Sequence, residues 1–188
     1  LAGKRVLITS GACREPVDDV RILTTRSSGR MGRALALEAF RLGADVTVVH
    51  RDTFPCVRNV PADSAGEMRE GVLGWLREHG GTDLYISAAA VSDFAPARVM
   101  GKIPSGSPAV LDLRPLPKLL DEVIAAFHPV TVAFKIGREP EPAARRLLEN
   151  GVSAVLANTP ATMGSDTGEY LLITRDTGVR LSGTKEGI

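Results

Sequence analysis

Ser27-Ser28-Gly29-Arg30-Met31-Gly32 leads directly into an amphipathic segment with helical periodicity. Apolar residues at 31, 34, 35, 37, 39, 40 and 42 predict a helix over 29–42, and Gly43 is a typical stop. The first turn of a helix has unpaired N–H groups, and its dipole attracts anions. In the alternative interpretation, the serines only cap the helix and the glycines only allow packing. The surrounding cations favour an anion site; they are Arg14, Arg21, Arg26, Arg30 and Arg33.

The segments on either side of this helix have the pattern of buried parallel strands. Short apolar runs cover 5–10 and 45–50, and a strand, helix and strand in this order predict a right-handed crossover. We expect further helices at 65–79, 116–127 and 142–150, strands at 83–88, 130–134 and 154–158, and a hairpin of 169–174 with 178–181. The alternation predicts an α/β fold. It is a Rossmann-like, doubly wound, mostly parallel sheet with a C-terminal hairpin and ligands at the carboxyl ends of the strands.

Two segments show no clear periodicity and are expected to be loops. Residues 11–26 are rich in Arg, Asp and Thr, and residues 95–108 hold three prolines and two glycines around Lys102. Long loops inside compact domains are usually functional lids or disordered. The second loop leaves the carboxyl end of a predicted strand, where ligands are expected to bind.

Length and composition restrict the class of protein. A chain of 188 residues with 44% hydrophobic and 24% charged residues predicts one globular domain over 1–188. The net charge of +1 gives no reason to expect nucleic acid or a membrane surface as a partner. The first five residues do not form a secretory signal, and they look like an internal cut from a longer polypeptide. We therefore expect a cytoplasmic location.

Several familiar motifs are absent. The turn after the first strand, residues 11–16, has one glycine, so the dinucleotide pattern Gly-x-Gly-x-x-Gly fails. Neither tyrosine has a lysine four residues later, and no Gly-Lys pair is followed by Ser or Thr. These absences disfavour hydride transfer and P-loop chemistry. Cys13 and Cys56 form no disulfide framework or zinc motif, and we expect Cys13 to be a small residue in a tight loop.

Several individually weak motifs occur in a fixed order along nearly the whole chain. They are residues 11–16, Val20-Arg21, residues 27–32, residues 88–94, Lys102, residues 132–135, Ala157-Asn158 and residues 163–166. Their order and spacing resemble those of phosphopantothenate–cysteine ligase, which often forms the carboxy-terminal half of a bifunctional coenzyme A biosynthesis flavoprotein.

The resemblance implies a Rossmann-like homodimer that needs no redox cofactor. It implies that 4′-phosphopantothenate is joined to cysteine through an acyl-nucleotidyl intermediate, with CTP or ATP as co-substrate and Mg²⁺ as its usual companion. No protein metal site is expected. A flavin-dependent decarboxylase, fused or docked, is the expected macromolecular partner.

Residue roles follow from the resemblance, position by position. The small residues Ala89 and Ala90 and the carboxylate of Asp93 would meet phosphopantothenate, and Arg21 would reach its phosphate from the other subunit. Lys102 would be the lysine of a mobile strap that closes over the reacting groups. The nucleotide-binding residues implied by the family are Gly11, Ser27, Ser28, Gly29 and Gly32 for the phosphates, with Phe134 and Asn158 for the base and sugar.

Three positions depart from the family pattern. Thr25 stands where the family has an asparagine that handles the acyl intermediate, so Thr25 is a candidate catalytic residue. Lys102 is followed by Ile103-Pro104-Ser105 instead of further lysines, and Cys13 replaces a threonine. Three alternatives stay open: a nucleotide-binding homologue with altered carboxylate–amine ligase activity, an NAD(P)-dependent reductase, and a non-catalytic domain docked onto a flavoprotein.

Overall fold

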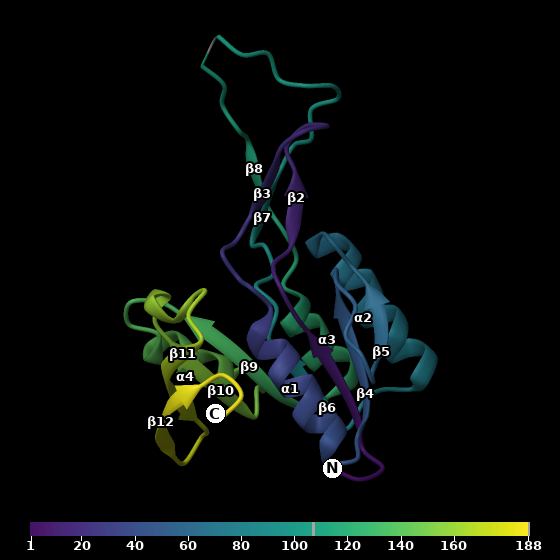
Figure 1. The fold of residues 1–188 in the computed structure, drawn as a ribbon, viewed down its shortest axis with the longest axis vertical. Coiled ribbons are helices and arrows are strands. Elements are labelled where there is room, and N and C mark those ends of the chain that lie inside the picture. The colour runs from purple at the N-terminus through teal and green to yellow at the C-terminus, as the bar shows by residue number, and fades with distance from the viewer. Residues whose placement is uncertain (107, 188) are drawn as a thin grey trace.

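The computed structural model describes residues 1–106 and 108–187 and consists of an α/β body with a projecting arm (Figure 1). The helices are α1 Arg30–Arg41, α2 Ala65–His79, α3 Leu119–Phe127, α4 Glu141–Glu149 and the 3-10 turn η1 Pro160–Thr162. The strands are β1 Arg5–Thr9, β2 Arg14–Pro16, β3 Ile22–Thr24, β4 Asp45–His50, β5 Arg58–Pro61, β6 Leu84–Ser87, β7 Phe94–Pro96, β8 Leu113–Pro115, β9 Val130–Ile136, β10 Ala154–Asn158, β11 Thr167–Ile173 and β12 Gly178–Thr184.

Eight strands form the central sheet in the order β12-β11-β10-β9-β6-β1-β4-β5. The pairs from β10 to β5 are parallel, and β11 and β12 add an antiparallel hairpin at one edge. The predicted α/β fold with a mostly parallel sheet and a C-terminal hairpin is therefore confirmed. From β1 the chain extends the sheet toward β4 and β5, whereas from β6 it extends the sheet the other way. This reversal leaves a crevice at the carboxyl ends of β1 and β6, where ligands bind in such sheets.

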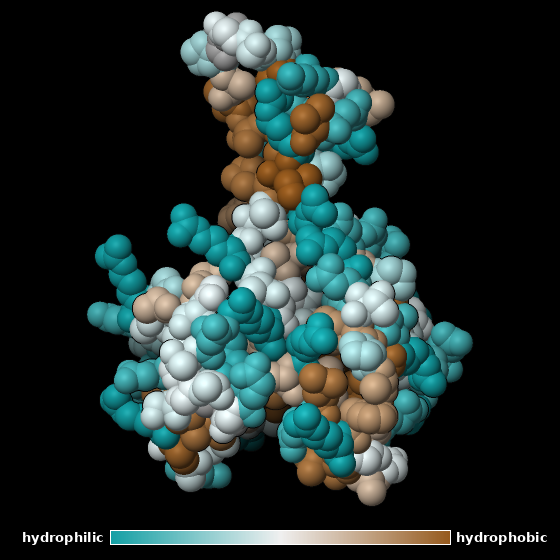
Figure 2. Space-filling model, in the orientation of Figure 1, coloured by the Kyte–Doolittle hydropathy of each residue, from teal (hydrophilic) through white to brown (hydrophobic). Residues whose placement is uncertain are grey.

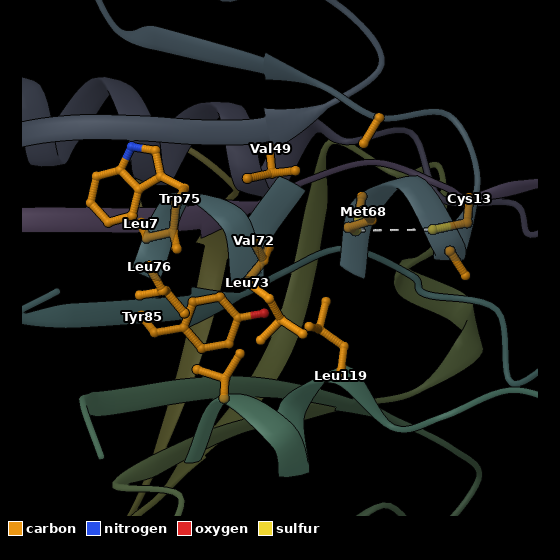
Figure 3. Packing of buried hydrophobic residues seen from close by; sticks show 13 residues of the cluster. Leu7, Cys13, Val49, Met68, Val72, Leu73, Trp75, Leu76, Tyr85 and Leu119 are labelled. Carbon is orange, nitrogen blue, oxygen red and sulfur yellow. Dashed lines mark hydrogen bonds between the residues drawn. The ribbon is translucent and has the colours of Figure 1, made fainter. Parts of the chain in front are cut away.

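Helices cover both faces of the sheet. On one face α1 packs Ala36 and Ala39 against the side chains of Ile8 and Val48. The other face is covered by α2, α3 and α4. Figure 3 shows the largest cluster on that face, in which Val72 and Leu76 of α2 lie among Leu7, Val49 and Tyr85 of the sheet. Each fully buried aliphatic side chain of this kind contributes about 1.5–3 kcal/mol to stability.

The ends of α2 and α1 are stabilised in different ways. At the start of α2, Ser64 accepts a hydrogen bond from the Glu67 N–H, and the Glu67 carboxylate accepts from the Ser64 N–H. Gly80 closes α2 in the left-handed conformation, with φ 66°. By contrast, α1 begins after Gly29, and no side chain caps it. The first N–H groups of α1 therefore have no side-chain oxygen of the helix cap to bind. The interpretation of Ser27 and Ser28 as simple helix caps is wrong for this reason.

The arm is formed by two segments that the sequence pattern assigned to loops. Within 11–26, β2 pairs antiparallel with β3, and β7 at the start of 95–108 pairs antiparallel with β8. Both loop predictions are therefore wrong in part, because strands of three residues, most of them with a proline, leave no detectable alternation. Ser107 lies outside the described residues. The hairpins are joined by the Val99 N–H to Val17 O bond at 2.9 Å and by the Arg98–Asp19 ion pair at 3.0 Å.

The strand β5 is a further element that the sequence pattern did not reveal. It contains one aliphatic residue, Val60, between polar or proline neighbours, so it has no apolar run. Among the described residues, no helix combines the length and apolar character needed to cross a membrane.

Candidate active site

A cleft of about 420 Å³ lies at the carboxyl ends of β6, β9 and β10 and beside the start of α1. The turn of residues 27–30 forms one wall, and residues 87–93 after β6 form another. Its position matches the crevice expected at the reversal of strand order. The cleft contains both polar and apolar side chains, as small-molecule sites usually do.

Two glycines bring the start of α1 against the end of β1. Gly29 has φ 72°, and a Cβ there would lie 3.3 Å from Gly11 Cα. A Cβ on Gly32 would lie 2.6 Å from Ser10 Cβ, so any side chain would push the helix away. The Ser10 hydroxyl donates to the Gly29 carbonyl at 3.2 Å and fixes the turn. The uncapped N–H groups of α1 consequently face a space that an anion can occupy.

Cationic side chains dominate the charge of the cleft. Arg30, Lys118, Lys135 and Lys185 line it, and of the lining residues in the described chain only Asp93 is acidic. The Lys118 ammonium pairs with the Asp93 carboxylate at the rim. The remaining positive charge suits a ligand that carries several anionic groups.

Lys185 is the most deeply placed of these cations. Its exposed fraction is 8%, although it follows the last strand of the chain. Burial lowers the pKa of the Lys185 ammonium, and the nearby Arg30 guanidinium lowers it further. Arg30 itself pairs with Asp166, whose carboxylate acts on Lys185 in the opposite direction. A bound anion would relieve the repulsion between the two cations.

Part of the lining of the cleft is apolar. Phe134, Ile136, Met163 and Tyr170 line it, and together they offer a surface for a flat or branched apolar group. The Asn158 amide nitrogen donates to the Thr162 hydroxyl, and the amide oxygen of Asn158 takes no part in this hydrogen bond.

Thr25 carries an unpaired polar atom at the edge of the cleft. Its Oγ1 is buried and has no hydrogen-bond partner among the described residues. A buried hydroxyl without a partner costs about 1–3 kcal/mol, so a ligand that bonds to it would recover that energy.

Most residues implied by the resemblance meet in this cleft. Gly11 lies just beyond the turn of residues 27–30, in an adjoining hollow. Arg21 and Lys102 are on the arm and line neither space. Their roles stay predictions. The residues that the fold brings together in the cleft are Thr25, Ser27, Ser28, Gly29, Gly32, Ala89, Ala90, Asp93, Phe134 and Asn158.

Cys13 lies in the core beside the arm and not in the cleft. It is fully buried, its Sγ is 4.0 Å from the Met68 Sδ, and burial raises the pKa of its thiol to about 11. A thiol with this pKa is protonated at neutral pH, so the expectation of a small packing residue agrees with its position.

The sequence pattern missed three cations of the cleft. Lys118 follows Pro117 and immediately precedes α3, and this position at a helix start could have indicated a ligand-binding residue. Lys135 lies inside β9, at the end of the matching residues 132–135, but the resemblance assigns no role to it. Lys185 follows β12 and lies outside the motifs. Only the fold places these three positions together.

The sequence matches the family model described as the DNA/pantothenate metabolism flavoprotein C-terminal domain over residues 1–186. The chain belongs to this family. It is 41% identical over 187 residues to the coenzyme A biosynthesis bifunctional protein CoaBC of Thermococcus kodakarensis, covering 94% of this chain and 46% of that protein. It is 37% identical over 160 residues to the CoaBC protein of Vibrio vulnificus, covering 79% of this chain and 39% of that protein.

Solved structures agree with this membership in the DNA/pantothenate metabolism flavoprotein family. The C-terminal domain of a CoaBC protein superposes with a TM-score of 0.81 at 30% identity, covering all of this chain and 90% of that one. A Cab2 variant in complex with phosphopantothenate-cysteine has a TM-score of 0.78 at 18% identity, covering 98% and 83%, and shows the shared fold. The chain spans less than half the length of the CoaBC proteins that it matches.

Proposed function

We propose that the chain joins 4′-phosphopantothenate to cysteine in coenzyme A biosynthesis, using a nucleoside triphosphate. The observation that carries the proposal is the cleft, in which an uncapped helix start faces several cations in a chain of this family. The overall reaction makes a C–N bond, so the protein would be an acid–amino-acid ligase.

The first step would activate the carboxylate of phosphopantothenate. A carboxylate oxygen attacks the α-phosphorus of the nucleotide, and the bond to the β-phosphate breaks, so that pyrophosphate leaves. Two anions must approach each other, and the N–H groups of α1 with Lys118, Lys135 and Lys185 would reduce their repulsion. The strap lysine Lys102 would add one more charge after the substrates bind.

Magnesium fits this step as a companion of the nucleotide. The described residues include no group of three or more His, Cys, Asp or Glu side chains that could hold a metal ion. Mg²⁺ usually binds through substrate phosphates and few protein ligands, and when bound it would neutralise phosphate charge.

The second step would transfer the acyl group to cysteine. The amine attacks the acyl carbon, the C–O bond to the nucleotide breaks, and nucleoside monophosphate leaves while the amine loses a proton. The unpaired Thr25 hydroxyl, which lines the cleft, would contact the intermediate in the position of the family asparagine. Phe134 and Asn158 would hold the nucleoside, and Ala89, Ala90 and Asp93 would hold the pantothenate part.

We also propose that the arm pairs with the arm of a second copy of this chain. Figure 2 shows hydrophobic side chains gathered along the arm, where a lone chain would expose them to water. Arg21 and Lys102 lie on the arm, outside their own cleft, so a second copy would let them serve the partner's cleft. The exposed fractions are 42–94% for Val20, Ile22, Phe94, Val99, Met100, Val110, Leu111 and Leu113.

Sedimentation tests the pairing of the arms. Met100→Glu and Val110→Glu should convert a dimer of about twice the chain mass into a monomer, because two charges would be buried without partners. Val179→Glu is the matched control, since Val179 is a half-exposed aliphatic residue on β12, outside the arm. A monomeric parent, or a dimer that survives both arm substitutions, would refute this pairing.

We further propose that the chain acts in the cytoplasm beside a flavin-dependent decarboxylase, fused or docked. This rests on the bifunctional CoaBC relatives, of which the chain matches less than half. The decarboxylase would consume the ligase product, so the two activities belong together.

Pyrophosphate release tests the proposed reaction. Release should require both phosphopantothenate and either CTP or ATP with Mg²⁺, and the amide product should appear only when cysteine is added. Amide formation with an amine other than cysteine would favour the altered homologue. A thermal shift with NADPH, but with neither triphosphate, would favour the reductase.

A further inference from the structure

A second hollow of about 440 Å³ lies across the turn of residues 27–30 from the cleft. The turn lines both spaces, so the two adjoin each other at residues 27–30. The other walls come from the end of β1, from α1 and from the segment after β4. They are residues 10–12, Arg33, His50, Arg51, Asp52 and Phe54.

This hollow is positively charged. Three arginines line it, namely Arg30, Arg33 and Arg51, against the carboxylate of Asp52. The Arg51 Nε lies 3.2 Å from Asp52 Oδ1, so Asp52 orients Arg51 and neutralises part of its charge. The Arg33 guanidinium lies 5.7 Å from the centre of the Phe54 ring, which holds it in place. Guanidinium groups bind phosphate oxygens in pairs of hydrogen bonds, so this arrangement suits a phosphate chain.

His50, which is 2% exposed, contributes a ring nitrogen without a hydrogen-bond partner among the described residues. The Asn59 amide nitrogen donates to two carbonyl oxygens at 2.9 Å, and its oxygen accepts from the Phe54 N–H at 2.8 Å. The His50 Nε2, 2.7 Å from that same oxygen, must therefore carry a hydrogen.

The other ring nitrogen of His50 is then left for a ligand. Burial lowers the pKa of His50, so the ring is neutral and its Nδ1 is a bare acceptor. No hydrogen bond joins Nδ1 to the described residues, although the side chain lines the hollow and the residue is only 2% exposed. A phosphate oxygen that carries a proton is a donor from which this nitrogen can accept a hydrogen bond.

The chemistry of nucleotide activation requires a second space of this kind. In displacement at phosphorus, the attacking and leaving oxygens lie on opposite sides of the phosphorus atom. If the carboxylate attacks from the cleft, the leaving pyrophosphate must point away from the cleft. The hollow beyond the turn lies in that direction.

We propose that the second hollow binds the two distal phosphates of the nucleoside triphosphate, with Arg33 and Arg51 as phosphate-binding residues. The α-phosphate then lies at the turn of residues 27–30, between the two spaces. When the bond between the α- and β-phosphates breaks, its electron pair stays on the pyrophosphate oxygen. The pyrophosphate remains among the arginines until it diffuses away. The assignment rests on the proposed ligase function and adds residues to it.

Calorimetry with inorganic pyrophosphate, CTP, ATP and the two monophosphates tests the assignment. Arg33→Gln and Arg51→Gln should each weaken pyrophosphate and the preferred triphosphate about tenfold, since each removes charge-assisted hydrogen bonds. The matching monophosphate should change by less than about twofold. Arg41→Gln is the control, because Arg41 is exposed at the other end of α1 and pairs only with Glu38 among the described residues.

The outcomes distinguish a failure of the proposed phosphate site from a failure of the proposed ligase function. Unchanged pyrophosphate binding in both variants, no pyrophosphate binding by the parent, or an equal loss for the monophosphate would overturn the site. Melting curves confirm that each variant is folded before binding is measured. A parent that binds pyrophosphate through these arginines, but releases none from nucleotide and phosphopantothenate, would overturn the ligase function and leave the phosphate site standing.

Discussion

The main-chain N–H of Ile103 donates to the carboxylate of Asp18 across 3.0 Å, and this bond ties the segment after Lys102 to the first hairpin of the arm. The same buried carboxylate accepts from the N–H groups of Val20 and Arg21 at 2.8 and 2.7 Å and pairs with the Arg21 guanidinium. These bonds, the one from Ile103 first, hold the pKa of Asp18 well below its usual range. Asp18 thus fixes the relative positions of the two arm residues assigned to the reaction.

Replacing Asp18 with asparagine should loosen the arm. The neutral side chain loses the ion pair and part of its acceptor capacity, so amides 101–103 should exchange with solvent faster and pyrophosphate release should fall. Asp112→Asn, an exposed carboxylate on the other hairpin, is the matched control. In the parent, the carboxylate's contribution is complete above the unfolded pKa of about 3.9 and is lost as the pH falls through the folded pKa. Equal exchange in the Asp18 variant and the parent at pH 7 would show that this bond does not hold the arm.

Adding a methyl group at Gly32 should separate α1 from β1. The new Cβ would overlap Ser10, so we expect a loss of about 1–3 kcal/mol in unfolding free energy and much weaker triphosphate binding. Gly74→Ala in α2 is the control. A Cβ there meets nothing within 4 Å, and the change should stabilise by about 0.5–1 kcal/mol. Urea denaturation measures the unfolding free energy, and calorimetry measures triphosphate binding. A Gly32 variant that binds the triphosphate as tightly as the parent would show that the phosphate site lies elsewhere.

Lys102→Gln should suppress pyrophosphate release by about 10² or more, because it removes a charge that assists the activation step. Lys4→Gln removes the same charge at the amino end of β1, far from the cleft, and should leave the rate unchanged. Rates are measured with both substrates saturating. If the Lys102 variant releases pyrophosphate at the parent rate, the arm lysine takes no part in activation.

Thr25→Asn should speed the second half of the reaction. Asparagine offers both a donor and an acceptor and reaches further than threonine, so the acyl-nucleotidyl intermediate should accumulate in the parent and disappear faster in the variant. Nucleotide affinity should change little. Thr25→Val, which keeps the shape and removes the unpaired hydroxyl, separates packing from chemistry. A quenched time course that finds no intermediate in the parent, and no faster product formation in the asparagine variant, would show that Thr25 has no role in the second step.

The extent to which the sequence predicts the structure depends on the length of each element. The range 65–79 is predicted to the residue, because Ser64, Glu67 and Gly80 mark both ends of α2 chemically. The helix of 29–42 is also confirmed, within one residue at each end. The three-residue strands of the arm have too few positions to show alternation, and antiparallel pairing within each hairpin defines them instead.

The residues of the cleft could also be predicted only in part. Residues 88–93 could be predicted as ligand-binding because they follow a strand of a parallel sheet, where ligands collect. Residues 27–32 could be predicted because they begin a helix among several arginines. Lys185 and Arg51 could not, because a single lysine or arginine after a strand has no distinguishing pattern. Their surroundings depend on which strands become neighbours. That order is a property of the whole fold.

The fate of a carboxylate oxygen tests the central claim most directly. Phosphopantothenate labelled with ¹⁸O in its carboxylate is incubated with cysteine and the preferred triphosphate, and the products are weighed by mass spectrometry. An acyl-nucleotidyl intermediate predicts one ¹⁸O in each nucleoside monophosphate and one in the amide carbonyl. Label in orthophosphate, or no amide at all with either CTP or ATP, would contradict the assignment of this cleft as a nucleotide-dependent ligase.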